Sequence, residues 1–255
     1  MTLTISGVTL VAYLLASIRL VAWLMIVPPF STRAVPVLAK VLLAVALSLA
    51  VTPHLAAGRA PSSAVGLVST ALGEALIGAS MGFVTYLVFA TVQAAGDLID
   101  VFGGFSLAAA FDPLSLNMNS VNGKLFSMLA MMLLFATDAH LLVIGGLLRS
   151  FETMPVGTPW PLDSVTHVVT VAFGMFFTTA VQIALPMIAV LFIADLGLAL
   201  LTKVAPQLNA INVMFPVKIG LTLLVVGLTF PVLPGAVDHL VELATQAMST
   251  MSGAG

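Results

Sequence analysis

Long apolar segments, separated by short polar or proline-containing breaks, constrain this chain more than any other feature. A helix needs about 20 mostly apolar residues to cross the hydrocarbon core of a bilayer. The sequence holds six such segments, at residues 8–29, 36–57, 64–92, 125–148, 165–194 and 211–234. The alternating apolar and polar stretches that build membrane barrels do not occur. We therefore predict an all-α polytopic membrane protein, formed as a single membrane domain over residues 1–255.

The composition excludes several classes of function. Charged residues make up 7% of the chain, against about 25% in a typical soluble domain. The formal net charge is −2 and the basic residues are scattered, so nucleic acid is not an expected partner. The chain has no cysteine, no histidine pair at metal-ligand spacing and no glycine-rich phosphate loop. We therefore expect no metal, no cofactor and no enzymatic activity; an intramembrane hydrolase lacks a convincing nucleophile.

The longest break between apolar segments, residues 93–124, is the first candidate for a functional element. It contains the acidic residues Asp97, Asp100 and Asp112, a Gly103-Gly104 pair and the aromatic residues Phe102, Phe105 and Phe111. Irregular backbone at membrane depth is tolerated only where protein buries it or where it lines a water-filled cavity. Aromatic side chains on a glycine-containing segment can close a channel, because hydrophobic constrictions gate by losing water.

Charged residues inside apolar segments mark helix faces that do not meet lipid. A charge at the centre of a lipid-facing helix costs about 2.5–3.5 kcal/mol, so Arg19, Glu74, Asp138 and Asp195 should face protein or water. One interpretation is a proton or ion relay built from the acidic residues Glu74, Asp138 and Asp195 together with His140. The other is charge pairing for assembly, which we favour because the charges are spread one per segment, unlike the clustered sites of transporters.

Small residues at helical spacing predict close helix contacts. Gly78 and Gly82 lie four residues apart in the third segment. Such spacing lets two helix backbones approach closely. The third and fifth segments are longer than a perpendicular span requires, and the fifth contains Pro186, so we expect tilted, kinked or broken helices there.

The order and spacing of several short motifs is similar to one known family. The strongest stretch comprises Asp112-Pro113, Asp138-Ala139-His140, the sequence LLRSF at 147–151 and the sequence MPVG at 154–157. A second stretch comprises the sequence APQLN at 205–209, with Pro216 and Lys218 after it. Over nearly the whole chain, this pattern resembles the FliR family of export-gate proteins in flagellar type III secretion, which has relatives in virulence injectisomes. Ala139 departs from the glycine common there, whereas His140 and Phe151 favour the flagellar branch.

The resemblance implies a partner set and a location. It implies one copy of the chain in a helical hetero-oligomer with FliP and FliQ, packed as hairpins, with FlhB nearby. The assembly would form the entry of the channel through which unfolded flagellar proteins cross the bacterial inner membrane at the flagellar basal body. The apolar segments then need not all span the lipid membrane.

The resemblance also implies roles for particular residues. Residues 103–122 would form a plug loop in the channel, with the candidate residues Phe102, Gly103, Gly104, Phe105, Phe111, Asp112 and Pro113. Polar contacts within the membrane or between subunits are expected at Arg19, Glu74, Asp97, Asp138, His140, Asp195, Gln207, Asn209 and Lys218. The alternative function is a stand-alone secondary transporter or channel, with Glu74, Asp138 and Asp195 lining its pathway.

Overall fold

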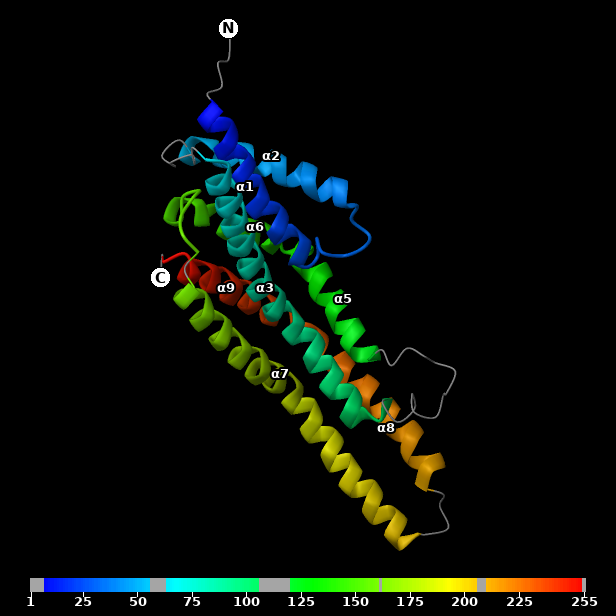
Figure 1. Ribbon diagram of the computed structural model, residues 1–255. Helices are drawn as coiled ribbons and strands as arrows, with labels where there is room; N and C mark the ends of the chain where they lie inside the picture. Colours follow the sequence, from blue (N-terminus) through cyan, green and yellow to red (C-terminus); the bar gives the residue numbers. More distant parts are fainter. Residues whose placement is uncertain (1–6, 56–62, 106–119, 161, 206–209, 254–255) are drawn as a thin grey trace. The chain divides into compact units, whose positions relative to one another are not determined.

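Every regular element that the structure describes is helical, which confirms the predicted all-α class (Figure 1). The computed structural model describes residues 7–55, 63–105, 120–160, 162–205 and 210–253. Its helices are α1 (Gly7–Ile26), α2 (Val37–Leu55), α3 (Ala64–Gly103), α5 (Val121–Ala136), α6 (Ala139–Thr153), α7 (Leu162–Val204), α8 (Ala210–Thr229), the short 3₁₀ helix η1 (Phe230–Val232) and α9 (Leu233–Met251). All six predicted apolar segments therefore lie in helices.

The helix lengths correct several predicted boundaries. The third segment does not end at residue 92, because α3 continues to Gly103. Its last turns look polar in sequence, yet Asp100 is buried against the start of α5 and forms part of a helix contact. The predicted break at 93–124 is therefore too long, and Phe102 and Gly103 belong to a helix. Residues 106–119, which include Phe111, Asp112 and Pro113, lie outside the described residues.

Two further segments are divided differently from the prediction. Segment 125–148 consists of two helices, α5 and α6, because the chain turns at Asp138, whose φ of 55° is left-handed. Segment 211–234 covers α8 and η1, and it misses α9, whose mixed polar and apolar sequence hides it from a hydropathy window. In the described residues, four helical stretches are long and apolar enough to cross a membrane: α1, α3, α7 and residues 216–251. A fifth counts if α5 and α6 form one broken span.

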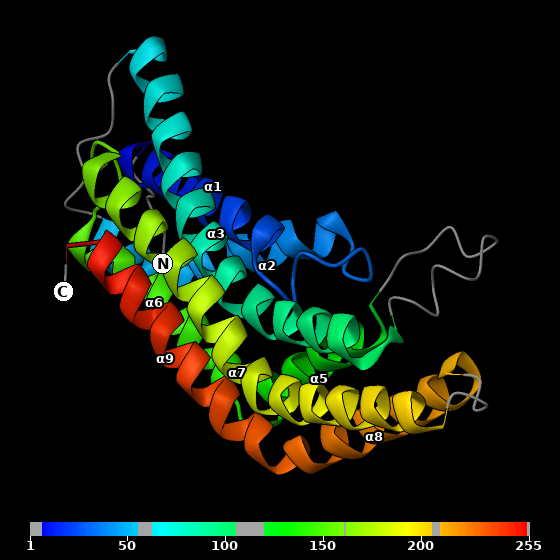
Figure 2. The same cartoon turned by 90° about the horizontal axis from the view of Figure 1, so that it is seen from below.

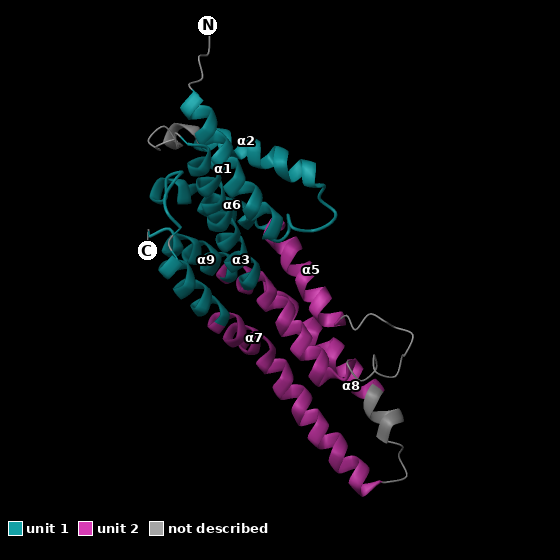
Figure 3. Cartoon of the chain, in the orientation of Figure 1, with its two compact units in different colours: residues 1–88, 137–173, 240–255 teal, residues 89–136, 174–239 magenta. Residues whose placement is uncertain are grey.

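Contacts divide the chain into two compact units (Figure 3). Unit 1 comprises residues 1–88, 137–173 and 240–255, and unit 2 comprises residues 89–136 and 174–239. The prediction of one domain over 1–255 stays a prediction. Helices α1 and α2 form an adjacent pair in unit 1, joined by the hydroxyl of Tyr13, which donates to the carbonyl of Val45 at 2.6 Å. In unit 2, α7 and α8 lie side by side as a hairpin, which Figure 2 shows best.

The core of unit 1 follows from glycine spacing on α3. Gly78 and Gly82 face α1: a Cβ at Gly78 would collide with the backbone carbonyl of Arg19, and one at Gly82 would lie 3.3 Å from the carbonyl of Trp23. The two helices can approach this closely because neither glycine has a side chain. Leu20, Trp23, Leu24, Ile77 and Met81 fill the space around this contact and are fully buried.

Candidate polar network in unit 1

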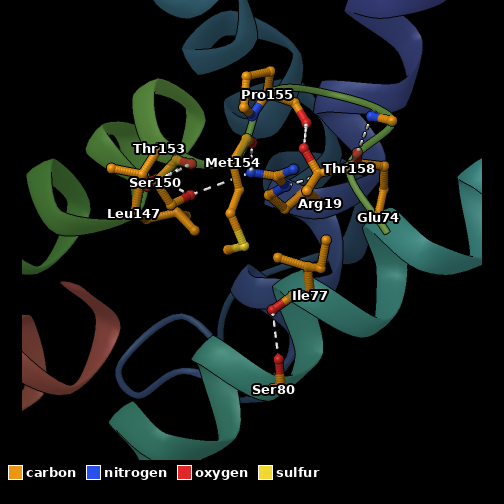
Figure 4. A network of polar contacts seen from close by, with 11 residues as sticks. Arg19, Glu74, Ile77, Ser80, Leu147, Ser150, Thr153, Met154, Pro155 and Thr158 are labelled. Carbon is orange, nitrogen blue, oxygen red and sulfur yellow. Dashed lines mark hydrogen bonds and ion pairs between the residues drawn. The ribbon is translucent and has the colours of Figure 1, made fainter. Parts of the chain in front are cut away.

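A buried ion pair joins α1 to α3 (Figure 4). Arg19 Nε donates to Glu74 Oε2 at 2.6 Å, and the exposed fractions of the two side chains are 0% and 1%. Glu74 lies one helical turn before Gly78, so the carboxylate projects from the same face of α3 that contacts α1. The close approach at the glycines therefore brings the two charges together in a space that excludes solvent.

Arg19 also contacts the C-terminal end of α6. Its Nη1 donates to the carbonyl of Met154 at 3.0 Å and to Ser150 Oγ at 3.4 Å. Met154 is the residue that ends α6, where unpaired carbonyl groups and the helix dipole favour a cation. The guanidinium also lies 4.2 Å from the centre of the Phe151 ring, which favours the charge further. Arg19 thus fixes the end of α6 against α1.

Glu74 holds the connection between α6 and α7. Its Oε1 accepts a hydrogen bond from the backbone N–H of Gly157 at 2.9 Å. Gly157 has a φ of 90°, a conformation that residues with a side chain rarely adopt. Each oxygen of the carboxylate therefore has its own partner, one on α1 and one in the 154–161 connection. Three segments that are far apart in sequence, α1, α3 and the stretch from Ser150 to Gly157, meet at this one pair.

Of the other predicted polar residues, Lys218 and Asp195 form a second ion pair. Lys218 Nζ lies 2.8 Å from Asp195 Oδ2 and pairs α8 with α7, and these side chains are 17% and 32% exposed. Asp138 is exposed and makes no side-chain hydrogen bond to cap α6. His140 follows in the first turn of α6 and is half-buried. Gln207 and Asn209 lie outside the described residues, so their predicted contacts stay predictions.

The predicted loop residues that the structure describes pack at the end of α3. Gly103 is buried, and a Cβ there would lie 2.7 Å from Thr222 Oγ1 of α8. Gly104 has a φ of 84° and ends the helix, with the side chain of Lys218 beside it. Phe102 is exposed and Phe105 is half-buried. The plug role of these residues stays a prediction.

Sequence reasoning missed several members of these contacts. In the sequence, Ser150, Met154 and Gly157 stand out only as parts of family-like motifs, and Asp100 only as an acidic residue of the predicted break at 93–124. Met154 acts through its carbonyl and Gly157 through its N–H, which every residue carries, so no sequence signal marks them. Asp100 had a signal, because it lies three residues after Asp97 and so on the same face of a continuing helix.

The fold and the network define a class of protein. Within the described residues no group of three or more His, Cys, Asp or Glu side chains could hold a metal ion. Both oxygens of Glu74 and two of the three nitrogens of Arg19 already have protein partners, so the pair ties helices together. These features define a helical membrane protein in which buried charge serves packing.

Comparison with known proteins identifies the family. The chain belongs to the bacterial export proteins, family 1, whose model matches residues 10–244. It is similar to the flagellar biosynthetic protein FliR of Escherichia coli (strain K12), at 32% identity over 88% of this chain and 85% of the relative. It is also similar to FliR of Bacillus subtilis (strain 168), at 29% identity over 94% of each chain.

A secretion protein gives a shorter match. The secretion system apparatus protein SsaT of Salmonella typhimurium is 29% identical over 66% of this chain and 64% of the relative. The FliR family that the motifs indicate is therefore confirmed, and this chain is a membrane component of a bacterial export apparatus.

Proposed function

We propose that this chain is the FliR subunit of the flagellar type III export gate. In this role it assembles with FliP and FliQ in the bacterial inner membrane, with FlhB nearby, and helps to form the entry through which unfolded flagellar proteins leave the cytoplasm. The role is structural rather than catalytic. The two flagellar relatives named above match 88% and 94% of this chain and SsaT matches 66%, which supports the flagellar branch.

The observation that carries the assembly proposal is the length of α7. Its 43 residues extend about 65 Å at 1.5 Å per residue. The hydrocarbon core is about 30 Å thick, and a tilt of 40°, near the upper limit for membrane helices, accommodates about 40 Å. Roughly 25 Å of the helix must therefore lie outside the lipid core.

Outside its buried stripe, α7 exposes polar side chains from Asp163 to Thr170 and mainly apolar side chains from Val171 to Val204, over about 50 Å. Its buried residues form one stripe, at Val165, Val168, Ala172, Ala180, Ala184, Met187 and Leu191. The other faces expose large apolar side chains from Val171 to Val204. Lipid cannot cover all of them, and water would leave a large exposed apolar surface. We therefore propose that apolar helices of partner subunits cover this surface of α7.

Co-purification tests this proposal. The chain is expressed with and without FliP and FliQ, extracted in mild detergent and weighed by native mass spectrometry. The gate proposal predicts a mixed particle with one copy of this chain. A well-behaved particle of this chain alone, indifferent to FliP and FliQ, would instead favour the transporter alternative and contradict the gate role.

A variant pair tests whether the exposed face of α7 is the contact. Phe192 and Ile193 are both more than half exposed, so replacing both with alanine removes little packing within the chain. We expect lower recovery of the mixed particle with unchanged recovery of the chain alone. Gln246→Ala, at an exposed polar position of α9, is the control and should leave both unchanged. Equal recovery for both variants would place the contact elsewhere.

We also propose that residues 103–122 act as the plug of the channel. The described ends of this segment support the idea: Gly103 packs on α8, and Ser120 Oγ donates to Asp100 Oδ2 on α3 at 2.5 Å. Both ends are therefore attached to the last turns of α3. Deletion of 106–119 should raise ion leakage through the assembled gate. A deletion variant that assembles normally and conducts no more than the parent would contradict the plug role.

A further inference from the structure

Two acidic side chains of α3 converge on the first turn of α5, within unit 2, and the proposed function uses neither. Asp100 Oδ2 accepts from Ser120 Oγ at 2.5 Å and from the backbone N–H of Asn122 at 3.1 Å, and its Oδ1 accepts from Asn122 Nδ2 at 2.5 Å. Asp97 lies one turn earlier, and its Oδ1 occupies the space where a Cβ on Gly123 would lie. Ser120 Oγ borders the same space.

The cluster has more negative charge than its surroundings balance. Among the described residues, neither Asp97 nor Asp100 forms an ion pair, and Lys124, the next residue but one after Asn122, is exposed. The N-terminus of α5 contributes the equivalent of about half a positive charge. The buried Asp100 and the half-buried Asp97 therefore leave more than one negative charge without compensation, which is costly for groups withdrawn from water.

Two buried oxygen atoms of the cluster lack a hydrogen-bond donor. They are Asp97 Oδ1 and Asn122 Oδ1. Asn122 is fully buried, and its amide group is held in the cluster by the bond from Nδ2 to Asp100. Ser120 Oγ gives its hydrogen to Asp100 and accepts the N–H of Gly123 at 2.8 Å, so one lone pair remains. Asp97 Oδ1 and Asn122 Oδ1 thus accept no hydrogen bond, and Ser120 Oγ and Asp100 Oδ1 each keep one lone pair.

We propose that this cluster binds a sodium ion, with Asp97 Oδ1, Asn122 Oδ1 and Ser120 Oγ as ligands. A hard cation is the partner that oxygen atoms of this kind prefer. Calcium takes six to eight ligands, usually with several carboxylates, whereas Asp97 Oδ1 is the one buried carboxylate oxygen of this cluster that accepts no hydrogen bond. The single charged ligand that remains matches a monovalent ion. This site does not depend on the proposed role in export.

The test measures sodium binding to the purified full-length chain. Radioactive sodium should bind saturably, with one ion per chain, and replacing choline chloride with sodium chloride at equal ionic strength should raise the unfolding temperature. Asp97→Asn removes the charged ligand and should weaken binding by about tenfold or more, since loss of a supporting group alone costs about 10–100-fold at metal sites. Asp238→Asn, at an exposed acid of α9, is the control and should bind like the parent.

Measurements on the unsubstituted protein test whether sodium binds, even if a variant fails to fold. An unfolding temperature that is equal in sodium and choline, with no saturable sodium binding, overturns the proposal. Stability that changes with pH and not with sodium also overturns it and assigns a proton to the cluster. Binding that survives unchanged in both Asp97→Asn and Ser120→Ala places the ion elsewhere and overturns the assignment of ligands.

Discussion

Removal of the Glu74 carboxylate should destabilise unit 1 strongly. The substitution Glu74→Ala leaves the fully buried Arg19 guanidinium without its counter-ion, and it leaves the N–H of Gly157 without an acceptor. Breaking a buried ion pair from one side costs about 3–5 kcal/mol, because the remaining charge is uncompensated. For a chain of this size, 1 kcal/mol corresponds to roughly 2–4 °C, so the midpoint of thermal unfolding should fall by roughly 6–20 °C.

A double substitution separates the charge from the packing. In Arg19→Met with Glu74→Leu no buried charge remains, so most of the ionic cost should disappear. The carbonyl of Met154 and the N–H of Gly157 still lose their partners, at about 1–3 kcal/mol for each group that finds no water. The double variant should therefore be more stable than Glu74→Ala and less stable than the parent.

Thermal unfolding of the purified chain in detergent, followed by circular dichroism, measures all three proteins. Lys218→Met is the comparison, because it breaks an ion pair that is half-buried, at 17% and 32% exposed, and should therefore cost less than loss of the fully buried pair. A loss below about 1 kcal/mol for Glu74→Ala, or a double variant less stable than the single one, would refute the reasoning that burial of the charge sets the cost.

Three further predictions concern single positions. Gly78→Ala should destabilise the protein by about 1–3 kcal/mol, because its Cβ would meet the rigid backbone carbonyl of Arg19. Gly73 has open space around it, so Gly73→Ala should be neutral or stabilising by up to about 1 kcal/mol. Thermal unfolding of the two variants measures the difference. Asp138→Val should lower the free energy of unfolding by about 1–2 kcal/mol and Asp138→Gly should change it little, because the backbone at Asp138 is left-handed, with a φ of 55°. Denaturant unfolding of both variants measures these changes. Asp100→Ala should speed hydrogen exchange in the first turn of α5 by about tenfold or more, because three hydrogen bonds are lost; unchanged exchange would contradict the contact.

Hydropathy located the helices, because burial in a membrane or an apolar core requires apolar residues whichever way a helix packs. It could not locate the end of α3 or the start of α9. In α3 the polar residues from Asp97 to Gly103 contact other helices of unit 2, so the helix continues where the sequence looks like a loop. In α9 polar residues such as Asp238 and Glu242 lie on an exposed face opposite a buried apolar one. A window average cancels these two faces.

The polar residues could be predicted individually but their pairs could not. The energetic cost of charge in an apolar helix singled out Arg19, Glu74 and Asp195. Which charge meets which depends on helix packing, and the contact of Arg19 with α3 depends on the missing side chain of Gly78. The bonds to Met154 and Gly157 use backbone atoms, which carry no residue-specific signal.

The reach of Arg19 along the chain has a consequence for biosynthesis. Its partner Glu74 is synthesised 55 residues later, and its partner Met154 is synthesised 135 residues later. At about 5–20 residues per second, roughly 4–16 s pass between the synthesis of Glu74 and that of Met154. During this interval Arg19 and Glu74 are already in the insertion machinery, but the end of α6 that contacts Arg19 has not yet been synthesised. A ribosome stalled before residue 154 should therefore leave a nascent chain that membrane proteases cleave readily, and one stalled well after residue 157 should not.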